Sequence, residues 1–326
     1  MNITSCTELL AKAEMPKTHI HVLKGLLSGH VGMMLAAPGI GKSRLAMSIA
    51  IEVAANYPVI GVSGSSEPIK TLFISSEDVE DILIERMTYI FNHVPADKRE
   101  VLAKHLDFST DIEPIVSPPE VNNEDFFAAK ANVDKLKNIF SDYKLVIIDT
   151  ISEVIGSCDE VRHDRHIKNT LKDLAESSGA AILVIHHINK EDIRGRNKLS
   201  MASGSGLSTL MRLSKYQIGM VKNDGELQLQ FLKHNYLKQD EISPITLTTS
   251  AGGFITASSV VKPGLKEQSD PIIQANEPKP HTPKTSNKAP TKSRVSNEQK
   301  RVNKEPDSIE LDISGQDSSE DLRGVI

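Results

Sequence analysis

The sequence lacks several features that would point to a secreted, metal-binding or membrane protein. It has two cysteines, Cys6 and Cys158, and no tryptophan, and aromatic residues make up 4% of its 326 residues. Two cysteines provide neither a disulfide framework nor a complete set of metal ligands. No apolar run approaches the roughly 18 residues of a membrane-spanning helix, and no basic start leads into an apolar block. We therefore expect a cytoplasmic protein that does not contact a membrane.

The chain also lacks an excess of positive charge. Its formal net charge is −5, so any contact with nucleic acid would have to come from local basic loops. The composition changes near Lys262, after which proline, lysine, serine and asparagine dominate and apolar residues become rare. Such a segment cannot bury enough apolar surface to offset the entropy lost on ordering. This change predicts one folded domain over residues 1–262 and a disordered low-complexity tail over residues 263–326.

Short apolar runs alternate with amphipathic stretches in the first 262 residues. The runs VGMMLA, TLFIS, KLVIID, AAILVIHH and YQIGMV are typical of parallel strands covered on both faces. Helices are predicted between them, over residues 42–55, 78–93, 124–141 and 163–178. The segments ELQLQFLKHN and ITLTTSAGGFITAS alternate with a period of two, and Gly252–Gly253 suits a hairpin turn. The pattern predicts an α/β fold with a mostly parallel central sheet, flanking helices and antiparallel C-terminal strands.

The segment AAPGIGKS, residues 36–43, is close to the phosphate-binding pattern G-x-x-x-x-G-K-[ST]. Gly41, Lys42 and Ser43 fit the pattern, whereas Ala36 stands in place of the first glycine. The segment follows a predicted strand and leads into a predicted helix. Backbone N–H groups and the helix N-terminus would therefore face the phosphates of a nucleotide. The alternative is a strand-to-helix turn that ends in Lys-Ser by chance.

The residues of this loop have expected roles in binding ATP. Lys42 would reach the β- and γ-phosphates, and Ser43 would offer its hydroxyl to Mg²⁺. Gly39 and Gly41 permit close approach of the backbone, and Pro38 stiffens the turn. The predicted nucleotide-binding residues are Pro38, Gly39, Ile40, Gly41, Lys42, Ser43 and Arg44.

Carboxylates follow two other predicted strands. Asp149 ends the run KLVIID and would hold Mg²⁺ through water, although aspartates that simply end strands are common. Glu77 and Asp78 follow TLFIS. If that strand lies beside the strand of the phosphate loop, Glu77 would orient and deprotonate the attacking water, with Asp78 capping the next helix. The alternative is that both residues are caps.

Two histidines, His186 and His187, end the predicted strand ILVIHH. A histidine at this edge would hydrogen-bond the γ-phosphate and report its loss to the following loop. A zinc pair is disfavoured because adjacent strand residues point to opposite faces of a sheet. An ordinary pair of polar residues at a strand end is the remaining alternative.

The motifs APGIGKS, FISSED, VIIDT, VIHHINK and KHNY resemble, in the same order, those of the RepA-like hexameric replicative helicases. These are RecA-type P-loop ATPases of the AAA_25 kind, and the resemblance covers residues 20–256. It implies a RecA-like core in which Ala36 is an acceptable variant. It also implies that Lys42 and Ser43 form the Walker A pair, that Asp149 is the Walker B aspartate, that Glu77 is the catalytic glutamate and that His187 senses the γ-phosphate.

The resemblance further implies a homo-oligomeric, hexameric ring whose active sites lie between subunits. Arg212 in STLMRLSKY and Lys233 in LKHNYL match the basic residues that would complete a neighbour's site. The sequence departs from the family over residues 200–206, where ASGSG lacks the usual arginine before the glycine. This departure leaves the match of Arg212 loose, and a solvated surface charge is the alternative.

The loop that follows the histidine pair carries four cations. They are Lys190, Arg194, Arg196 and Lys198. In the resembled fold this loop faces the ring centre, where the cations would contact the phosphates of single-stranded DNA without sequence preference. The loop lacks an aromatic residue for base stacking, and a merely solvated loop is the alternative.

Together these features lead us to expect an ATP- and Mg²⁺-dependent DNA helicase or translocase that acts in replication of a plasmid or mobile element. One alternative is a RecA-fold ATPase that remodels or regulates DNA-bound partners without unwinding. Another is a nucleotide-binding scaffold without activity. The tail ends in acidic residues interspersed with apolar ones, which would suit docking on a basic replication or loading protein.

Overall fold

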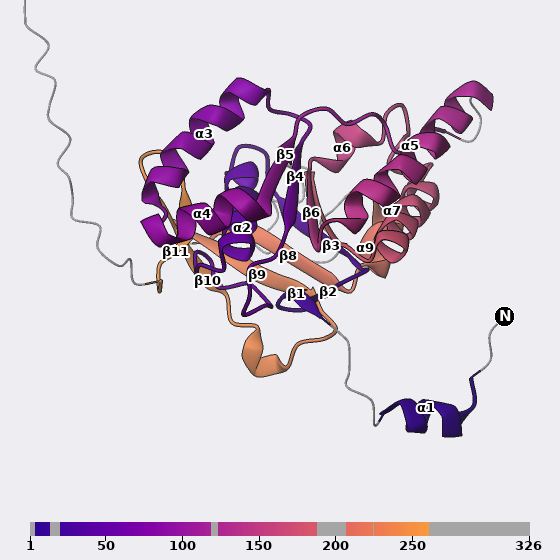
Figure 1. Ribbon diagram of the computed structural model, residues 1–326, viewed down its shortest axis with the longest axis horizontal. Helices are drawn as coiled ribbons and strands as arrows, with labels where there is room; N and C mark the ends of the chain where they lie inside the picture. Colours follow the sequence, from indigo (N-terminus) through magenta and orange to yellow (C-terminus); the bar gives the residue numbers. More distant parts are fainter. Residues whose placement is uncertain (1–3, 14–19, 119–122, 188–206, 224, 261–326) are drawn as a thin grey trace, which may run out of the picture. The chain divides into compact units, whose positions relative to one another are not determined.

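A computed structural model describes residues 4–13, 20–118, 123–187, 207–223 and 225–260 (Figure 1). Within these residues the strands form a two-stranded hairpin, β1-β2, and a nine-stranded sheet in the order β11-β10-β9-β8-β3-β7-β6-β4-β5. The strands are β1 (His21–Leu23), β2 (Leu26–Leu27), β3 (Val31–Ala36), β4 (Thr71–Ser75), β5 (Leu106–Ser109), β6 (Leu145–Asp149), β7 (Ala181–His187), β8 (Tyr216–Asn223), β9 (Glu226–His234), β10 (Ile245–Thr249) and β11 (Ile255–Ala257). The strands from β8 to β5 are parallel, and β9, β10 and β11 continue the sheet antiparallel.

Helices cover both faces of this sheet (Figure 1). One apolar cluster joins the sheet to α2, α3 and α4, and a second joins it to α5, α6, α7 and α9. The helices are α1 (Cys6–Ala13), α2 (Lys42–Ala55), α3 (Glu80–His93), α4 (Ala96–His105), α5 (Asn123–Ser141), α6 (Ile151–Val154), α7 (Asp164–Ser178) and α9 (Ser208–Leu213), with a 3₁₀ turn at Gln239–Glu241. Two covered faces explain why the parallel strands appear in the sequence as continuous apolar runs.

Strand β3 shows how one run supplies both clusters. Met34 and Ala36 belong to the cluster with α2, whereas Met33 and Leu35 belong to the cluster with α7. Successive side chains of a strand point to opposite faces, and all four of these side chains are fully buried. Full burial of one large apolar side chain contributes about 1.5–3 kcal/mol, so β3 is held firmly in the centre of the sheet.

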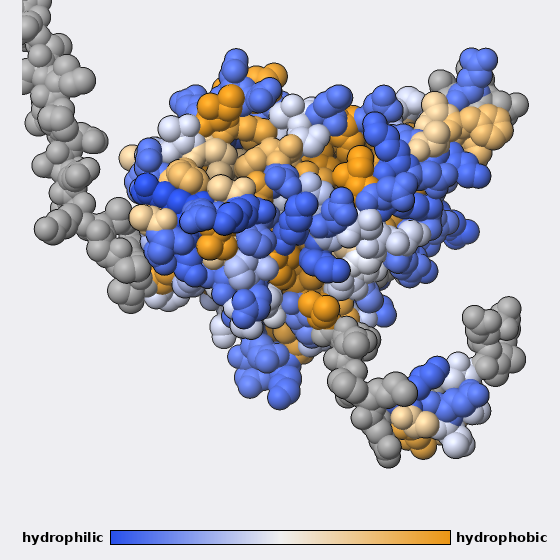
Figure 2. All heavy atoms as spheres, in the orientation of Figure 1, coloured by the Kyte–Doolittle hydropathy of each residue, from blue (hydrophilic) through white to orange (hydrophobic). Residues whose placement is uncertain are grey.

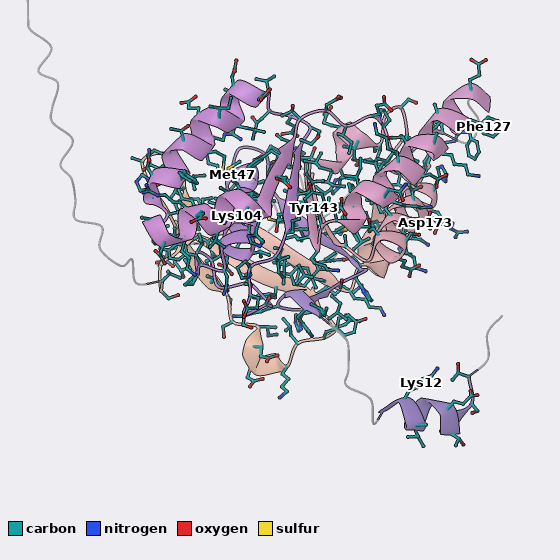
Figure 3. All side chains as sticks on the ribbon, viewed as in Figure 1. Lys12, Met47, Lys104, Phe127, Tyr143 and Asp173 are labelled. Atoms are coloured by element: carbon teal, nitrogen blue, oxygen red, sulfur yellow. The ribbon has the colours of Figure 1, made fainter. Side chains whose placement is uncertain are left out.

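Helices α5 and α7 lie side by side on one face. Lys137 of α5 forms an ion pair with Asp173 of α7 at 2.6 Å, and Asp173 is labelled in Figure 3. Phe127 projects from the first turns of α5 at the outer end of the helix and is 63% exposed (Figure 3). Figure 2 shows that apolar side chains also reach the surface over α3, on which Ile84 is half exposed.

A buried carboxylate organises the loop after α2. Glu52 is 2% exposed and accepts hydrogen bonds from the backbone N–H groups of Val59, Ile60, Gly61 and Ser63, at 2.5–2.9 Å. Four charge-assisted hydrogen bonds satisfy the carboxylate and fix the path of the loop. Sequence reasoning did not predict this anchor, because nothing in the helical pattern of residues 42–55 marks Glu52 as buried.

The predicted α/β fold is confirmed, including the antiparallel end and the hairpin turn at Gly252–Gly253. Helix α2 has the predicted bounds, and α3, α5 and α7 begin within two residues of the predictions. The sequence did not predict β5, α4 or the β1-β2 hairpin. The condition set for the role of Glu77, that β4 lies beside β3, is not met, because β7 and β6 lie between these strands.

No helix in the described part of the chain is long and apolar enough to cross a bilayer. The predicted boundary at Lys262 and the predicted tail over residues 263–326 lie outside the described residues, and both stay predictions.

Candidate active site

The carboxyl ends of four parallel strands meet at one edge of the sheet. Ala36 at the end of β3 is paired with His187 at the end of β7, and Ser75 of β4 is paired with Asp149 of β6. Glu77 follows β4 by two residues. Ligands of open parallel sheets bind at this edge, so the topology collects the predicted loop, carboxylates and histidine in one place.

The phosphate loop has the backbone that its sequence predicts. Gly39 and Gly41 have φ angles of 77° and 105°, a region that strongly favours glycine. Gly41 precedes α2 without a side-chain cap, which leaves N–H groups of the first helical turn available to an anion. Ala36 is the last residue of β3 and is fully buried, so its methyl group fits where the pattern has glycine.

Lys42, His187 and Glu77 form a continuous hydrogen-bonded chain across the site. Lys42 Nζ lies 2.9 Å from Nδ1 of His187, and Nε2 of His187 lies 3.0 Å from Oε1 of Glu77. A carboxylate only accepts, so Nε2 of His187 donates to Glu77. Lys42 Nζ also lies 3.3 Å from Nε2, so the ammonium is close to both ring nitrogens.

The electrostatics of the site keep Glu77 ionised. Burial alone would raise the pKa of Glu77, but hydrogen bonds from His187 and Thr150, and the charges of His187 and Lys42, outweigh it and lower the pKa. Burial lowers the pKa of Lys42, and the carboxylates of Glu77 and Asp149 partly offset that shift. An ionised Glu77 can accept a proton at neutral pH.

Asp149 has the properties of a cation ligand. It is 1% exposed, and its Oδ1 atom has no hydrogen-bond partner among the described residues. Burial raises the pKa of Asp149 to about 6, whereas a hydrogen bond from Ser43 counteracts part of that shift. A buried, unsatisfied carboxylate oxygen beside a serine hydroxyl fits Mg²⁺, which prefers oxygen ligands. No cluster of three or more His, Cys, Asp or Glu side chains suited to another metal site occurs within the described ranges.

Two residues that the sequence analysis missed join the strands that carry the carboxylates. The Ser76 hydroxyl contacts the carbonyl oxygen of Asp149 at 2.9 Å and accepts a hydrogen bond from the Thr150 N–H at 2.9 Å. The Thr150 hydroxyl donates to Oε1 of Glu77 at 3.1 Å. Their signal in the sequence is only that each is a small hydroxyl residue next to a predicted site carboxylate.

Asp78 does not cap α3, contrary to the prediction. The residue before α3 is Val79, which provides no side-chain cap. The carboxylate of Asp78 instead pairs with Arg86 through both oxygens, one of these contacts measuring 3.1 Å. Of the two adjacent acids, Glu77 is therefore the one that faces Lys42 and His187.

The two histidines point in opposite directions, as expected for neighbours on a strand. His187 is one-third exposed and faces the site. His186 is 2% exposed, and its Nδ1 lies 3.8 Å from Oε1 of Glu160 in the loop before α7. Glu160 also accepts a hydrogen bond from Ser152 of α6. His186 therefore helps to hold the loop that follows Asp149 in place.

Arg212 and Lys233 lie away from the phosphate loop of their own chain. Tyr216, which begins β8 shortly after Arg212, is paired with Gly32, four residues before Ala36. Four residues span about 13 Å of strand. Arg212 is exposed, and Lys233 Nζ donates to the Arg212 carbonyl oxygen at 2.6 Å, so Lys233 caps the C-terminus of α9.

The remaining predicted residues are placed in part. Ile40 packs partly against the apolar core. Arg44 is exposed and lies against the hairpin turn at Gly253, and its role in nucleotide binding stays a prediction. The predicted DNA-contacting residues Lys190, Arg194, Arg196 and Lys198 lie outside the described residues.

The phosphate loop and the strand order give the chain a RecA-like P-loop fold, and the family that it matches makes it an ATP-hydrolysing enzyme. The sequence matches the model of the AAA_25 family, described as an AAA domain, over residues 7–192. The match spans more than half of the chain, and the chain belongs to this family.

Two solved structures are similar in fold. One is described as an ATPase domain, with a TM-score of 0.52 and 12% identity over 76% of this chain and 96% of that chain. The other is described as a DnaB-like replicative helicase and its interactions with primase, with a TM-score of 0.53 and 10% identity over 77% of this chain and 66% of that chain. At these identities the likeness concerns the fold alone.

Proposed function

We propose that this protein is an ATP-dependent DNA helicase or translocase of the RepA type, which uses ATP hydrolysis to move on DNA. The observation that carries the hydrolytic part is the chain from Lys42 through His187 to Glu77 at the end of the phosphate loop. It joins a phosphate-binding cation to a carboxylate that is ionised at neutral pH. The likeness in fold to a DnaB-like replicative helicase supports the role on DNA.

In the proposed reaction the loop and the N-terminus of α2 bind the phosphates of ATP. Lys42 leaves His187 and contacts the β- and γ-phosphates, and His187 becomes free to donate to the γ-phosphate. Glu77 accepts a proton from the attacking water as the water oxygen bonds to the γ-phosphorus. The bond from the γ-phosphorus to the β,γ-bridging oxygen breaks, and ADP and phosphate are the products.

Ser43 and Asp149 would hold Mg²⁺, which neutralises phosphate charge when it is bound. The unsatisfied Oδ1 of Asp149 and the adjacent Ser43 hydroxyl support this assignment.

The Glu77→Gln variant tests the general base. It should bind ATP as the native protein does but release phosphate about 10²-fold more slowly. The matched control is Glu80→Gln, at the start of the helix that follows Glu77 and outside the chain of contacts with Lys42. Normal turnover of Glu77→Gln would remove this assignment.

A forked-duplex unwinding assay separates the proposed helicase from an ATPase that remodels or regulates DNA-bound partners. A helicase should displace the labelled strand in the presence of ATP and not with the Lys42→Ala variant. Phosphate release that single-stranded DNA stimulates, without strand displacement, would favour the alternative.

The proposed assembly is a ring, hexameric by resemblance, in which Arg212 and Lys233 complete the site of a neighbouring subunit. Their place supports a role in trans, because Arg212 precedes the start of β8 and Lys233 is paired with that start. The start of β8 lies beside the start of β3, at the other end of β3 from the phosphate loop. Mixing Lys42→Ala with Arg212→Ala subunits should restore some activity, because some interfaces then have both residues. No recovery in rings that mass measurements show to be mixed would contradict this proposal.

The proposed contact with single-stranded DNA rests on Lys190, Arg194, Arg196 and Lys198. Neutralising one of them should weaken binding to all sequences about equally and reduce the salt slope by about one unit. A strong sequence preference would argue against this proposal.

The role in plasmid or mobile-element replication, and docking of residues 263–326 on a replication or loading protein, rest on the sequence. A chain truncated after Lys262 should keep its ATP turnover but lose recruitment to its partner in cells. Loss of turnover in the truncated chain would show that the predicted domain boundary is wrong.

A further inference from the structure

The hydroxyl side chains of Ser76 and Thr150 lie where β4 and β6 end, next to Glu77. The Ser76 backbone N–H donates to the Asp149 carbonyl oxygen at 2.8 Å, and the Ser76 hydroxyl contacts the same oxygen at 2.9 Å. That hydroxyl also accepts the Thr150 N–H at 2.9 Å. The contacts extend the pairing of the two strands by one residue beyond Ser75 and Asp149, and they fix Thr150 beside Glu77.

Thr150 holds the Glu77 carboxylate by one oxygen. Its hydroxyl donates to Oε1 at 3.1 Å, and His187 Nε2 lies 3.0 Å from the same oxygen. Among the described residues no side chain or backbone group donates to Oε2. Two donors on one oxygen restrict rotation of the carboxylate and leave the other oxygen free to face a water molecule.

The contact between Thr150 and Glu77 differs from that of an ordinary buried threonine. Thr71, at the opposite end of β4, is also fully buried, but its hydroxyl donates to the backbone oxygen of Ile69, two residues away. Such local bonds merely satisfy a buried hydroxyl. Thr150 is fully buried, yet its hydroxyl bonds a partly exposed side chain that follows a different strand.

We propose that Thr150 is a positioning residue that aims the general base Glu77, and that Ser76 holds Thr150 in the place where it does so. The inference rests on the proposed hydrolytic function and adds to it two residues that neither the loop pattern nor the family resemblance assigns. His187 shares Oε1, and in the proposed reaction it leaves that contact to donate to the γ-phosphate. Thr150 is then the donor that keeps Glu77 oriented during the reaction.

The central test is the Thr150→Val variant, which keeps the side-chain shape and removes the hydroxyl. A lost hydrogen bond to a charged group corresponds to a fall in kcat of about 10- to 100-fold. The KM for ATP and the affinity for a fluorescent ATP analogue should change by less than about threefold, because the phosphate contacts stay in place. Thr150→Ser keeps the hydroxyl and should retain most of the native kcat.

The Thr71→Val variant is the matched control, since it removes a buried threonine hydroxyl from the same strand that leads to Glu77. It should leave kcat unchanged. Ser76→Ala provides a second test if Thr150→Val does not fold, and its kcat should fall by a smaller factor than in Thr150→Val. Native kcat in a folded Thr150→Val protein, or an equal loss in Thr71→Val, would overturn the inference.

A double-mutant cycle distinguishes action through Glu77 from action through the adjacent Asp149. In a Glu77→Gln background, Thr150→Val should cause no further loss of turnover, because the group that it orients no longer accepts a proton. A further loss of about tenfold would mean that Thr150 acts on another group and would overturn the inference, while the proposed function would stand. Native turnover in Glu77→Gln alone would overturn the assignment of the base and, with it, this inference.

Discussion

Glu52 and Asp149 are the two least exposed carboxylates in the described part of the chain, and their surroundings differ in kind. Glu52, at 2% exposure, accepts four backbone N–H groups of the loop that it anchors. Asp149, at 1% exposure, has one oxygen without a partner among the described residues and a pKa that burial raises to about 6. The first carboxylate is satisfied by the protein, whereas the second is not.

The difference means that Glu52 stabilises the folded chain, whereas Asp149 destabilises it while its site is empty. A buried ionised group contributes to stability only when hydrogen bonds replace the water it has lost. Glu52 meets that condition in the folded chain alone. For Asp149 this condition is met only when a ligand supplies the missing interaction. Binding sites are commonly destabilising in this way while they are empty.

The largest expected effect is on turnover, and it concerns Lys42, the cation whose charge interacts with Glu77 and Asp149. Lys42→Ala should reduce phosphate release by about 10³-fold or more, because Lys42 is the loop cation that is joined to Glu77 through His187. The free energy of unfolding, measured in urea, should change by less than about 1 kcal/mol, since burial already disfavours the Lys42 charge. The control is Lys70→Ala, which removes a half-exposed cation near Asp107. Substantial turnover in Lys42→Ala would contradict the proposed site.

The next effect should appear in stability rather than turnover. Glu52→Gln replaces one acceptor oxygen by an NH₂ group, so N–H groups of the anchored loop lose their partner. We expect urea unfolding to show a loss of about 2–4 kcal/mol, with kcat unchanged below the melting temperature. Glu100→Gln is a suitable control because it breaks an exposed pair with Lys104. Equal losses in both variants would remove the distinction drawn for Glu52.

In the metal-free protein, Asp149→Asn should increase the free energy of unfolding, whereas Glu52→Gln should decrease it. The folded pKa of Asp149 is raised to about 6, above the roughly 4 of an unfolded aspartate, so wild-type stability falls as pH rises from the unfolded pKa through 6. The neutral asparagine avoids this loss. In EDTA at a pH of about 7.5 the variant should be about 2 kcal/mol more stable than the wild type, and the gap should close toward a pH of about 4. A gap that does not change with pH would contradict the raised pKa.

The smallest effect concerns the acid next to the proposed base. Asp78 pairs with Arg86 in a partly exposed position, so Asp78→Asn should cost about 0.5–1 kcal/mol in urea unfolding. Its turnover should stay within about threefold of the native value because, of these two adjacent acids, Glu77 is the one joined to Lys42 through His187. A fall in turnover of about 10²-fold would move the general base from Glu77 to Asp78.

Much of the fold and part of the site follow from the sequence for identifiable reasons. The apolar runs predict β3, β4, β6, β7 and β8 because parallel strands are buried on both faces. The loop from Gly39 to Ser43 is predictable because phosphate contact demands those residue types at fixed spacing.

Other features depend on long-range pairing and leave little trace in the local sequence. The order of the strands places β6 and β7 between β4 and β3, so Glu77 reaches Lys42 by way of His187 rather than from a neighbouring strand. Glu52, Ser76 and Thr150 owe their roles to partners that a one-dimensional pattern does not contain. Lys233 matches a family motif, yet its visible contact is with the end of α9.

The position of β3 also has a consequence for synthesis of the chain. Its neighbours in the sheet are β7 and β8, and Val31 is paired with Ile182, roughly 150 residues further along the chain. On the ribosome, the strand that leads into the phosphate loop stays without its partners until the second half of the domain has emerged. A nascent or partly folded chain lacks the complete sheet edge, so we expect it not to hydrolyse ATP. On this view, hydrolysis begins only after β7, which carries His187, has joined the sheet.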